Sequence, residues 1–447
     1  MSKSRWVSLA CVLLLITFGL TVRMVYQANT VVDAPLRADA GQYHRIAWNV
    51  INHGVFSMAY PAETSPEPDS YRGPGYPLLI ALSMRLGGEE HEYLYLLVIQ
   101  ALIGALSAGL TFLLARCWLS TGYALAAGLL VAIWPHSVAI SGLILTETLY
   151  GFCLLLAVYL LSRAWQSRSM LWYGLSGLVF AWAALVNPGI LFFPLALALL
   201  LAVQDRKCAI VFLLCALLLP GVWSVRGAML DTGSSSSGRL MENVLACMDR
   251  DFAYKDTPDA NAARERMREG VDRFEHDSGA ELQRIVDRLA TEPWAYARWY
   301  LLEKPIKYWR WALVEGGDDL HVYPVSVSAY HNLTFFQVTA ALCRGLNQIL
   351  MLGAFSAVAW LLVLFASRHG HQVAAPLLYV SLLFAYATAL HSVLMPDPRY
   401  AIPFRPFQIM LALSLVAMVH TYWRSHAARQ REGLTLQAQV SATSAPD

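Results

Sequence analysis

Four short motifs hold the side chains that could do chemistry in this chain. The first covers residues 37–47, where Asp39 and Tyr43 stand four positions apart and would share one face of a helix. A carboxylate in such a place can take a proton from a hydroxyl group. However, Asp39 followed by Gln42 also fits a capping box that merely starts the helix, and on this motif alone the structural explanation is the stronger.

The second motif is a turn at residues 71–78, where two prolines and two glycines fix a bend instead of a helix. Arg72 at its mouth could pair with a phosphate through its planar guanidinium group. The alternative is a turn that only starts the short apolar helix Leu78 to Leu86, with Arg72 solvated. The sequence does not separate these two interpretations.

The third motif, residues 145–150, places Glu147 at the edge of an apolar run. A carboxylate there is costly unless it has a partner or water, which makes it a functional candidate by default. The alternative is that Thr146 caps the helix while Glu147 offsets the helix dipole in the first turn. We favour the functional interpretation.

The fourth motif, residues 395–403, joins two apolar runs near the C-terminus. Its prolines stiffen the link, so Arg399 and Tyr400 are presented from a fixed position. Arg399 could hold the phosphate of a lipid carrier. It could also be a flanking arginine whose head group reaches for the membrane surface.

The elements that must position these motifs are membrane helices. The chain is 57% hydrophobic and 14% charged, against roughly a quarter charged in soluble domains. About ten apolar runs approach the roughly 20 residues that a helix needs to cross the hydrocarbon. They lie near Trp6–Tyr26, Tyr93–Ala115, Tyr123–Ile140, Leu143–Leu161, Met170–Val186, Ile190–Val203, Ala209–Val225, Leu346–Ala366, Val373–Leu394 and Ile402–Tyr422. The sequence thus predicts an all-α polytopic membrane protein.

Basic residues predict the orientation, because Lys and Arg are retained in cytoplasmic loops. Every second short loop is basic if the N-terminus is cytoplasmic; these loops hold Arg116, Arg163, Arg168, Arg206, Lys207 and Arg368, with Arg424, Arg429 and Arg431 in the tail. All four motifs then face outwards. We therefore expect a multi-pass protein of the cell inner (plasma) membrane with an extracytoplasmic site.

The alternation of apolar runs and polar loops divides the chain into four parts. Residues 1–225 form an N-terminal transmembrane module whose first outer loop, residues 28–92, contains juxtamembrane helices. Residues 226–332 form a small helical extracytoplasmic segment, with surface helices across residues 261–290. Transmembrane helices at 333–423 and a disordered cytoplasmic tail at 424–447 complete the chain. The stretch Pro293 to Leu313 mixes aromatic and cationic residues, which favours helices lying on the outer leaflet.

Several classes of function are disfavoured. No basic block or aromatic RNA-binding signature suggests a nucleic-acid partner. His44 and His53 lie nine apart without a zinc spacing, and the seven cysteines form no CxxC pair. We therefore expect no metal, no cofactor and no disulfide framework.

Taken in order, the four motifs resemble those of bacterial relatives of the dolichyl-phosphate-mannose protein mannosyltransferases and of the aminoarabinose lipid A transferases, which have a GT-C fold. The likeness runs from Trp6 to about Tyr422 and is strong only at the motifs. It implies that Asp39 is the general base and that Arg399, with Tyr400 beside it, contacts the carrier phosphate. Many members have a second acid directly after the first, whereas Ala40 stands there in this chain.

The function expected from the motifs and the resemblance is an inverting glycosyltransferase. It would move a sugar from a polyprenyl-phosphate carrier to a lipid, glycan or protein acceptor. Its catalytic candidates are Asp39 and Glu147, and its donor-binding candidates are Tyr43, Arg72, Arg399 and Tyr400. The alternatives are a transporter or lipid flippase, a glycan polymerase or ligase, and a non-enzymatic assembly subunit.

Overall fold

A computed structural model describes residues 3–60, 65–230, 236–252, 257–312, 323–367 and 373–443. The described chain is almost entirely helical. Its bundle consists of α1 (Lys3–Ala28), α3 (Gly75–Ala115), α4 (Thr121–Ile133), α5 (Pro135–Ala139), α6 (Glu147–Ser167), α7 (Met170–Val186), α8 (Phe193–Ala202), α9 (Arg206–Ala228), α16 (Thr334–Ala366), α17 (Ala375–Val393) and α18 (Arg405–Thr443). Short turns join some of them: η1 (Ile140–Gly142), η2 (Pro188–Ile190) and η5 (Pro398–Phe404).

Length and hydropathy confirm the polytopic, all-α prediction. In the described residues, seven helical segments are long and apolar enough to cross a membrane: Arg5–Ala28, Glu90–Ala115, Glu147–Ser167, Arg206–Ala228, Thr334–Ala366, Ala375–Val393 and Pro398–Arg424. One bent pair, Thr121–Ile133 with Pro135–Gly142, and two shorter apolar helices, Met170–Val186 and Pro188–Ala202, complete the set. Each of the ten apolar runs in the sequence falls on one of these segments.

The span expected at Tyr123 to Ile140 is broken by 51° where α4 meets α5. Trp134 is extended there because Pro135 disfavours helical geometry in the residue before it. Pro135 also has no N–H to donate to the turn before it. Arg23 of α1, which is fully buried, donates instead to the carbonyl oxygens of Val131 at 3.5 Å and Ala132 at 3.1 Å. The side chain of Arg23 therefore caps the C-terminal end of α4.

Two further helices lie between the first two spans in the sequence, and they pack against each other. Helix α2 (Asp39–Asn52) follows α1, and the first turns of α3 form a short helix that ends at a kink. Gly88 sits at that kink with φ +62°, a conformation that favours glycine. The span Glu90–Ala115 begins directly after it. Both helices fall in residues 28–92, where the sequence predicts helices.

The segment between α9 and α16 is built, in its described parts, mainly from short helices: α10 (Ser236–Met248), α11 (Pro258–His276), α12 (Ser278–Thr291), α13 (Pro293–Arg298), the π-helical turn η3 (Trp299–Glu303), α14 (Lys304–Trp309) and α15 (Ala329–Asn332). A two-stranded antiparallel ladder, absent from the sequence prediction, pairs β1 (Val31–Val32) with β2 (Val325–Val327). This ladder ties the end of the segment to the chain leaving α1.

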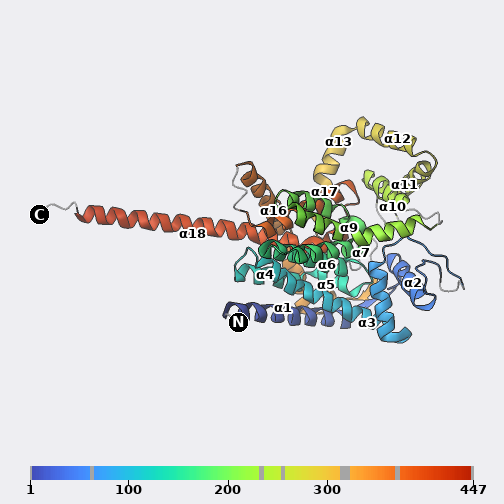
Figure 1. The fold of residues 1–447 in the computed structure, drawn as a ribbon, viewed down its shortest axis with the longest axis horizontal. Coiled ribbons are helices and arrows are strands. Elements are labelled where there is room, and N and C mark those ends of the chain that lie inside the picture. The colour runs from blue at the N-terminus through green and yellow to red at the C-terminus, as the bar shows by residue number, and fades with distance from the viewer. Residues whose placement is uncertain are drawn as a thin grey trace.

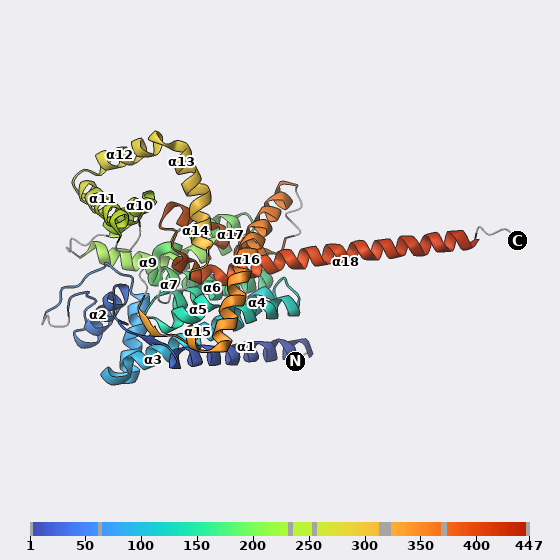
Figure 2. The ribbon, with the colours of Figure 1, turned by 180° about the vertical axis from the view of Figure 1, so that it is seen from behind.

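The two views of the ribbon show a molecule with two different ends. Helices α2 and α10 to α12 gather at one end, while the N-terminus and the long projection of α18 lie towards the other (Figures 1 and 2). The N-terminal end of α1 and the C-terminal end of α18 therefore both lie on the side away from α2.

Two sequence expectations need correction in detail. Part of the aromatic stretch is not a surface anchor, because Tyr308 and Trp309 are fully buried against the bundle while Trp294 and Leu301 are exposed. The tail for which the sequence predicts disorder continues as part of α18 to Thr443. Its residues are rich in good helix formers, so the last span has no signal that would end it.

Candidate active site

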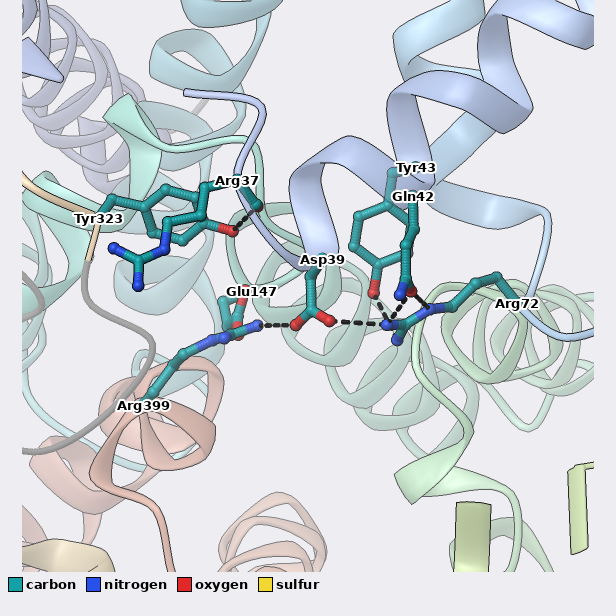
Figure 3. A network of polar contacts seen from close by, with 8 residues as sticks. All are labelled: Arg37, Asp39, Gln42, Tyr43, Arg72, Glu147, Tyr323 and Arg399. Atoms are coloured by element: carbon teal, nitrogen blue, oxygen red, sulfur yellow. Dashed lines mark hydrogen bonds and ion pairs between the residues drawn. The ribbon is translucent and has the colours of Figure 1, made fainter. Parts of the chain in front are cut away.

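Asp39 is the first residue of α2, at the end of the molecule opposite the termini (Figure 1). The preceding Ala38 has φ +49°, an uncommon conformation for a residue other than glycine, and makes no side-chain cap. Asp39 therefore stands inside the helix and cannot be the cap of a capping box. Its carboxylate turns to two arginines from distant parts of the chain (Figure 3).

Arg72 approaches Asp39 from the turn that begins α3. Its Nη2 donates to Asp39 Oδ1 at 2.6 Å, and its Nε donates to Gln42 Oε1 at 2.8 Å. Nη1 lies 3.4 Å from the hydroxyl of Tyr43. The arginine is buried and paired, so the interpretation of a merely solvated residue does not hold.

The position of Arg72 is fixed by the glycine that follows it. A Cβ atom on Gly73 would lie 2.2 Å from the carbonyl oxygen of Leu185, near the end of α7. Only a residue without a side chain lets the turn approach that backbone so closely. The packing of the turn on α7 therefore determines where Arg72 can reach.

Arg399 approaches the same carboxylate from η5, at the start of the last apolar segment. Its Nη2 donates to Asp39 Oδ2 at 3.1 Å, and its Nε donates to Glu147 Oε1 at 2.5 Å. The backbone N–H of Arg399 donates to Asp397 Oδ1 at 2.8 Å, so Asp397 caps this turn. Arg399 thus points into the protein and does not extend to the membrane surface.

Glu147 begins α6, and Thr146 before it makes no side-chain cap. The carboxylate is almost fully buried, and its Oε1 binds Arg399. Within the described part of the chain its second oxygen, Oε2, is buried without a hydrogen-bond partner. Because an unsatisfied buried acceptor is costly, this oxygen is notable as a free hydrogen-bond acceptor beside Arg399.

The site is an alternating row of charges in the order Arg72, Asp39, Arg399, Glu147 (Figure 3). Asp39 is the most open member, with 24% of its side chain exposed against 11% or less for the others. Burial alone would raise the pKa of Asp39, but the guanidinium groups of Arg399 and Arg72 outweigh it and hold the pKa well below its usual range. The free site therefore contains an ionised, strongly paired carboxylate.

Five of the six candidate residues from the sequence come together here: Asp39, Tyr43, Arg72, Glu147 and Arg399. Tyr400 lies beside them, with its ring 5.7 Å from the guanidinium carbon of Arg399 and stacked on His391. Burial, the largest influence, raises the pKa of the Tyr43 phenol, so its hydroxyl keeps its proton.

Two neighbours were not identified from the sequence. Gln42 binds Arg72, although it had been explained as the partner of Asp39 in a capping box. Tyr323 lies on the other side of Asp39 and donates from its hydroxyl to the carbonyl oxygen of Arg37 at 3.1 Å (Figure 3). The spacing of Gln42 one turn from Asp39 was a usable signal; nothing local marks Tyr323.

Within the described ranges no three or more His, Cys, Asp or Glu side chains gather as a metal site. The partners of the two site carboxylates in those ranges are arginines.

Comparison with known proteins agrees with this description. Residues 71–223 match the family described as dolichyl-phosphate-mannose-protein mannosyltransferase, a region that includes Arg72 and Glu147. None of the curated protein sequences matches the chain significantly.

Among solved structures, the oligosaccharyltransferase of Archaeoglobus fulgidus in its apo form is similar with a TM-score of 0.52 at 15% identity, covering 95% of this chain and 52% of that one. The archaeal oligosaccharyltransferase AglB from Archaeoglobus fulgidus, in complex with an inhibitory peptide and a dolichol-phosphate, has a TM-score of 0.51 at 16% identity, covering 99% of this chain and 55% of that one. ArnT from Cupriavidus metallidurans bound to undecaprenyl phosphate has a TM-score of 0.37 at 14% identity, covering 93% of this chain and 78% of that one.

The likeness to the archaeal enzyme establishes the fold. The chain is an all-α polytopic membrane protein with a GT-C fold, as expected from the sequence. It spans about half the length of the oligosaccharyltransferase that it matches.

Proposed function

We propose that this protein is an inverting glycosyltransferase that moves a sugar from a polyprenyl-phosphate carrier to an acceptor hydroxyl on the extracytoplasmic side of the inner membrane. The observation that carries the proposal is the row Arg72, Asp39, Arg399, Glu147. It places a possible base between two cations that suit an anionic leaving group. The GT-C fold and the family match at residues 71–223 support it.

In the proposed reaction Asp39 takes the proton of the acceptor hydroxyl as that oxygen attacks the anomeric carbon. The bond between this carbon and the phosphate oxygen breaks, and its electron pair leaves with the polyprenyl phosphate. Arg399 and Arg72 then stabilise the departing phosphate. Attack from the face opposite the phosphate inverts the anomeric centre.

The geometry of the free site suggests how the donor activates the base. Both oxygens of Asp39 accept from guanidinium groups, which lowers its pKa and makes it a poor base. A phosphate competes for the same two cations. We infer that donor binding draws Arg72 and Arg399 away from Asp39, raises its pKa and leaves an oxygen free for the acceptor.

The remaining candidates have supporting roles in this proposal. Glu147 orients Arg399 through Oε1 and offers Oε2 to a substrate hydroxyl. Tyr43 and Gln42 hold Arg72 in place, and the Tyr43 hydroxyl still has a proton to donate to the phosphate. Tyr400 supports Arg399 through its neighbouring ring.

A transporter would need polar backbone groups at a broken helix near the middle of the membrane. The break between α4 and α5 is such a feature, but the carbonyls of Val131 and Ala132 already accept from Arg23. Substrate transport at this break would have to displace a buried arginine. This contact favours the enzyme over the transporter.

The direct test uses purified protein in detergent with each class of donor in turn. We expect glycosyl transfer from a polyprenyl-phosphate sugar and none from a nucleotide sugar. Arg399→Ala should weaken binding of undecaprenyl phosphate by roughly tenfold or more, as expected when a charged hydrogen bond worth about 1.5–3 kcal/mol is lost. Transfer from a nucleotide sugar without carrier lipid would contradict the proposal.

A further inference from the structure

The loop that leads to Arg399 is held from the extracytoplasmic segment. Residues 394–397 connect the end of α17 to η5, and α14 packs against both of these elements. Three side chains make the connection: Lys304 and Tyr308 from α14, and His391 from α17.

Lys304 binds the end of α17. Its side chain is fully buried, and Nζ donates to the carbonyl oxygens of Val393 at 3.2 Å and Leu394 at 3.4 Å. The ammonium group also lies 3.9 Å from the centre of the Tyr300 ring. No carboxylate of the described residues forms an ion pair with it, so backbone carbonyls and aromatic rings replace an acid.

A buried ammonium group without an acid is costly, which makes Lys304 an unusual choice for simple packing. Its burial lowers the pKa to about 8. A methionine of similar length would fill the space without that cost. The charge is explained if its role is to bind the last carbonyls of α17, because the final carbonyls of a helix have no donor within that helix.

Tyr308 holds the other end of the loop. Its hydroxyl donates to the carbonyl oxygen of Tyr400 at 3.0 Å. Its ring stacks on His391 at 4.6 Å, and His391 stacks on Tyr400 at 5.4 Å. The Nδ1 atom of His391 lies 2.9 Å from the carbonyl oxygen of Met395 and donates to it.

The backbone is thus fixed at Val393, Leu394, Met395 and Tyr400, on both sides of Arg399. We propose that Lys304 and Tyr308 are positioning residues that set the guanidinium group of Arg399 between Asp39 and Glu147. Through them the extracytoplasmic segment determines how well the site holds the carrier phosphate. The role in phosphate binding rests on the proposed function, whereas the fixing of the loop does not.

The test compares Lys304→Met, which keeps the length of the side chain, with Lys207→Met at an exposed position at the start of α9. Hydrogen exchange should become at least tenfold faster at the amides of residues 399–402 in Lys304→Met, with no change in α6. Lys304→Arg should restore most of the protection, because a guanidinium group can also bind the two carbonyls. Tyr308→Phe should give a smaller increase at the same amides.

The second readout is the Kd for undecaprenyl phosphate. We expect Lys304→Met to raise it about tenfold and to have no further effect when Arg399→Ala is already present, because both changes act on one contact. Lys207→Met should leave both measurements unchanged.

Unchanged exchange at residues 399–402, an equal increase throughout the bundle, or a loss of affinity that persists in the Arg399→Ala background would each overturn the positioning role. If the wild-type protein does not bind undecaprenyl phosphate, the proposed function fails, and the exchange measurement alone decides whether Lys304 and Tyr308 fix the loop.

Discussion

Asp39 and Arg399 are 360 positions apart in the sequence, yet their side chains form an ion pair of 3.1 Å. The pair joins the start of α2 to η5, at the start of the last apolar segment. With Arg72 on the other oxygen of Asp39, it makes the carboxylate the centre of the site.

Asp39→Asn separates the roles of base and ligand. The amide cannot take up the proton, so turnover should fall by roughly 10²-fold or more. Because the substitution also frees the two arginines from a competing charge, the affinity for undecaprenyl phosphate should rise. Turnover and Kd of the purified variant should be compared with those of Asp33→Asn, an exposed acid on the same loop. Near-normal turnover, or weaker phosphate binding, would contradict this assignment.

The pH dependence should differ between the free enzyme and the donor complex. Without a donor, the pKa of Asp39 is held below its usual value of about 4. The ion pairs of Asp39 therefore stabilise the fold above about pH 4, and this stabilisation is lost only as the pH falls through the lowered pKa. When a phosphate takes over the arginines, the pKa should rise. The acid limb of kcat should therefore lie at higher pH than that of kcat/KM. Coincident limbs would show that the arginines remain on Asp39.

Gly73→Ala should displace Arg72. The added methyl group would meet the carbonyl oxygen of Leu185, which is backbone and cannot move aside, at a cost of about 1–3 kcal/mol. The matched control is Gly122→Ala in α4, where the new methyl group meets open space and helix propensity should improve stability by up to about 1 kcal/mol. Thermal midpoints in detergent and binding of undecaprenyl phosphate measure both effects. Equal behaviour of the two variants would remove the proposed role of this close approach.

The orientation can be tested by single cysteines at two exposed serines, Ser278 on α12 and Ser167 at the end of α6, after the seven native cysteines are replaced. A membrane-impermeant maleimide should label Ser278→Cys in intact cells. Ser167→Cys should react with the maleimide only after the cells are permeabilised. The reverse pattern would place the four motifs in the cytoplasm.

Much of the site could be predicted because its motifs lie at helix ends, where ionisable residues beside apolar runs are expensive and therefore informative. The sequence could not show which side chains pair when they lie far apart along the chain. Gln42 was explained by a neighbour three residues away, whereas its side chain binds Arg72. Lys304 resembled one more cation in an aromatic stretch, and only the fold brings it to the end of α17.

The fold itself was predicted well at the level of spans and less well within them. Hydropathy places an apolar helix across residues 123–140 because it averages over a window and does not register a single proline. The break at Pro135 is stable since Arg23, more than a hundred residues earlier, supplies donors to the freed carbonyls. A local sequence pattern cannot show that a distant arginine donates hydrogen bonds to the last carbonyls of a helix.

The pairing of Glu147 with Arg399 also has a consequence for biosynthesis. Glu147 leaves the ribosome 252 residues before its cation, so α6 enters the membrane with a carboxylate that has no partner. During that interval the acid must remain at the wet end of its helix or carry a proton, because an isolated charge in hydrocarbon is too costly. The ion pair can form only when η5 has been synthesised. A nascent chain that stops before η5 therefore contains Asp39, Arg72 and most of the membrane helices, but no assembled site.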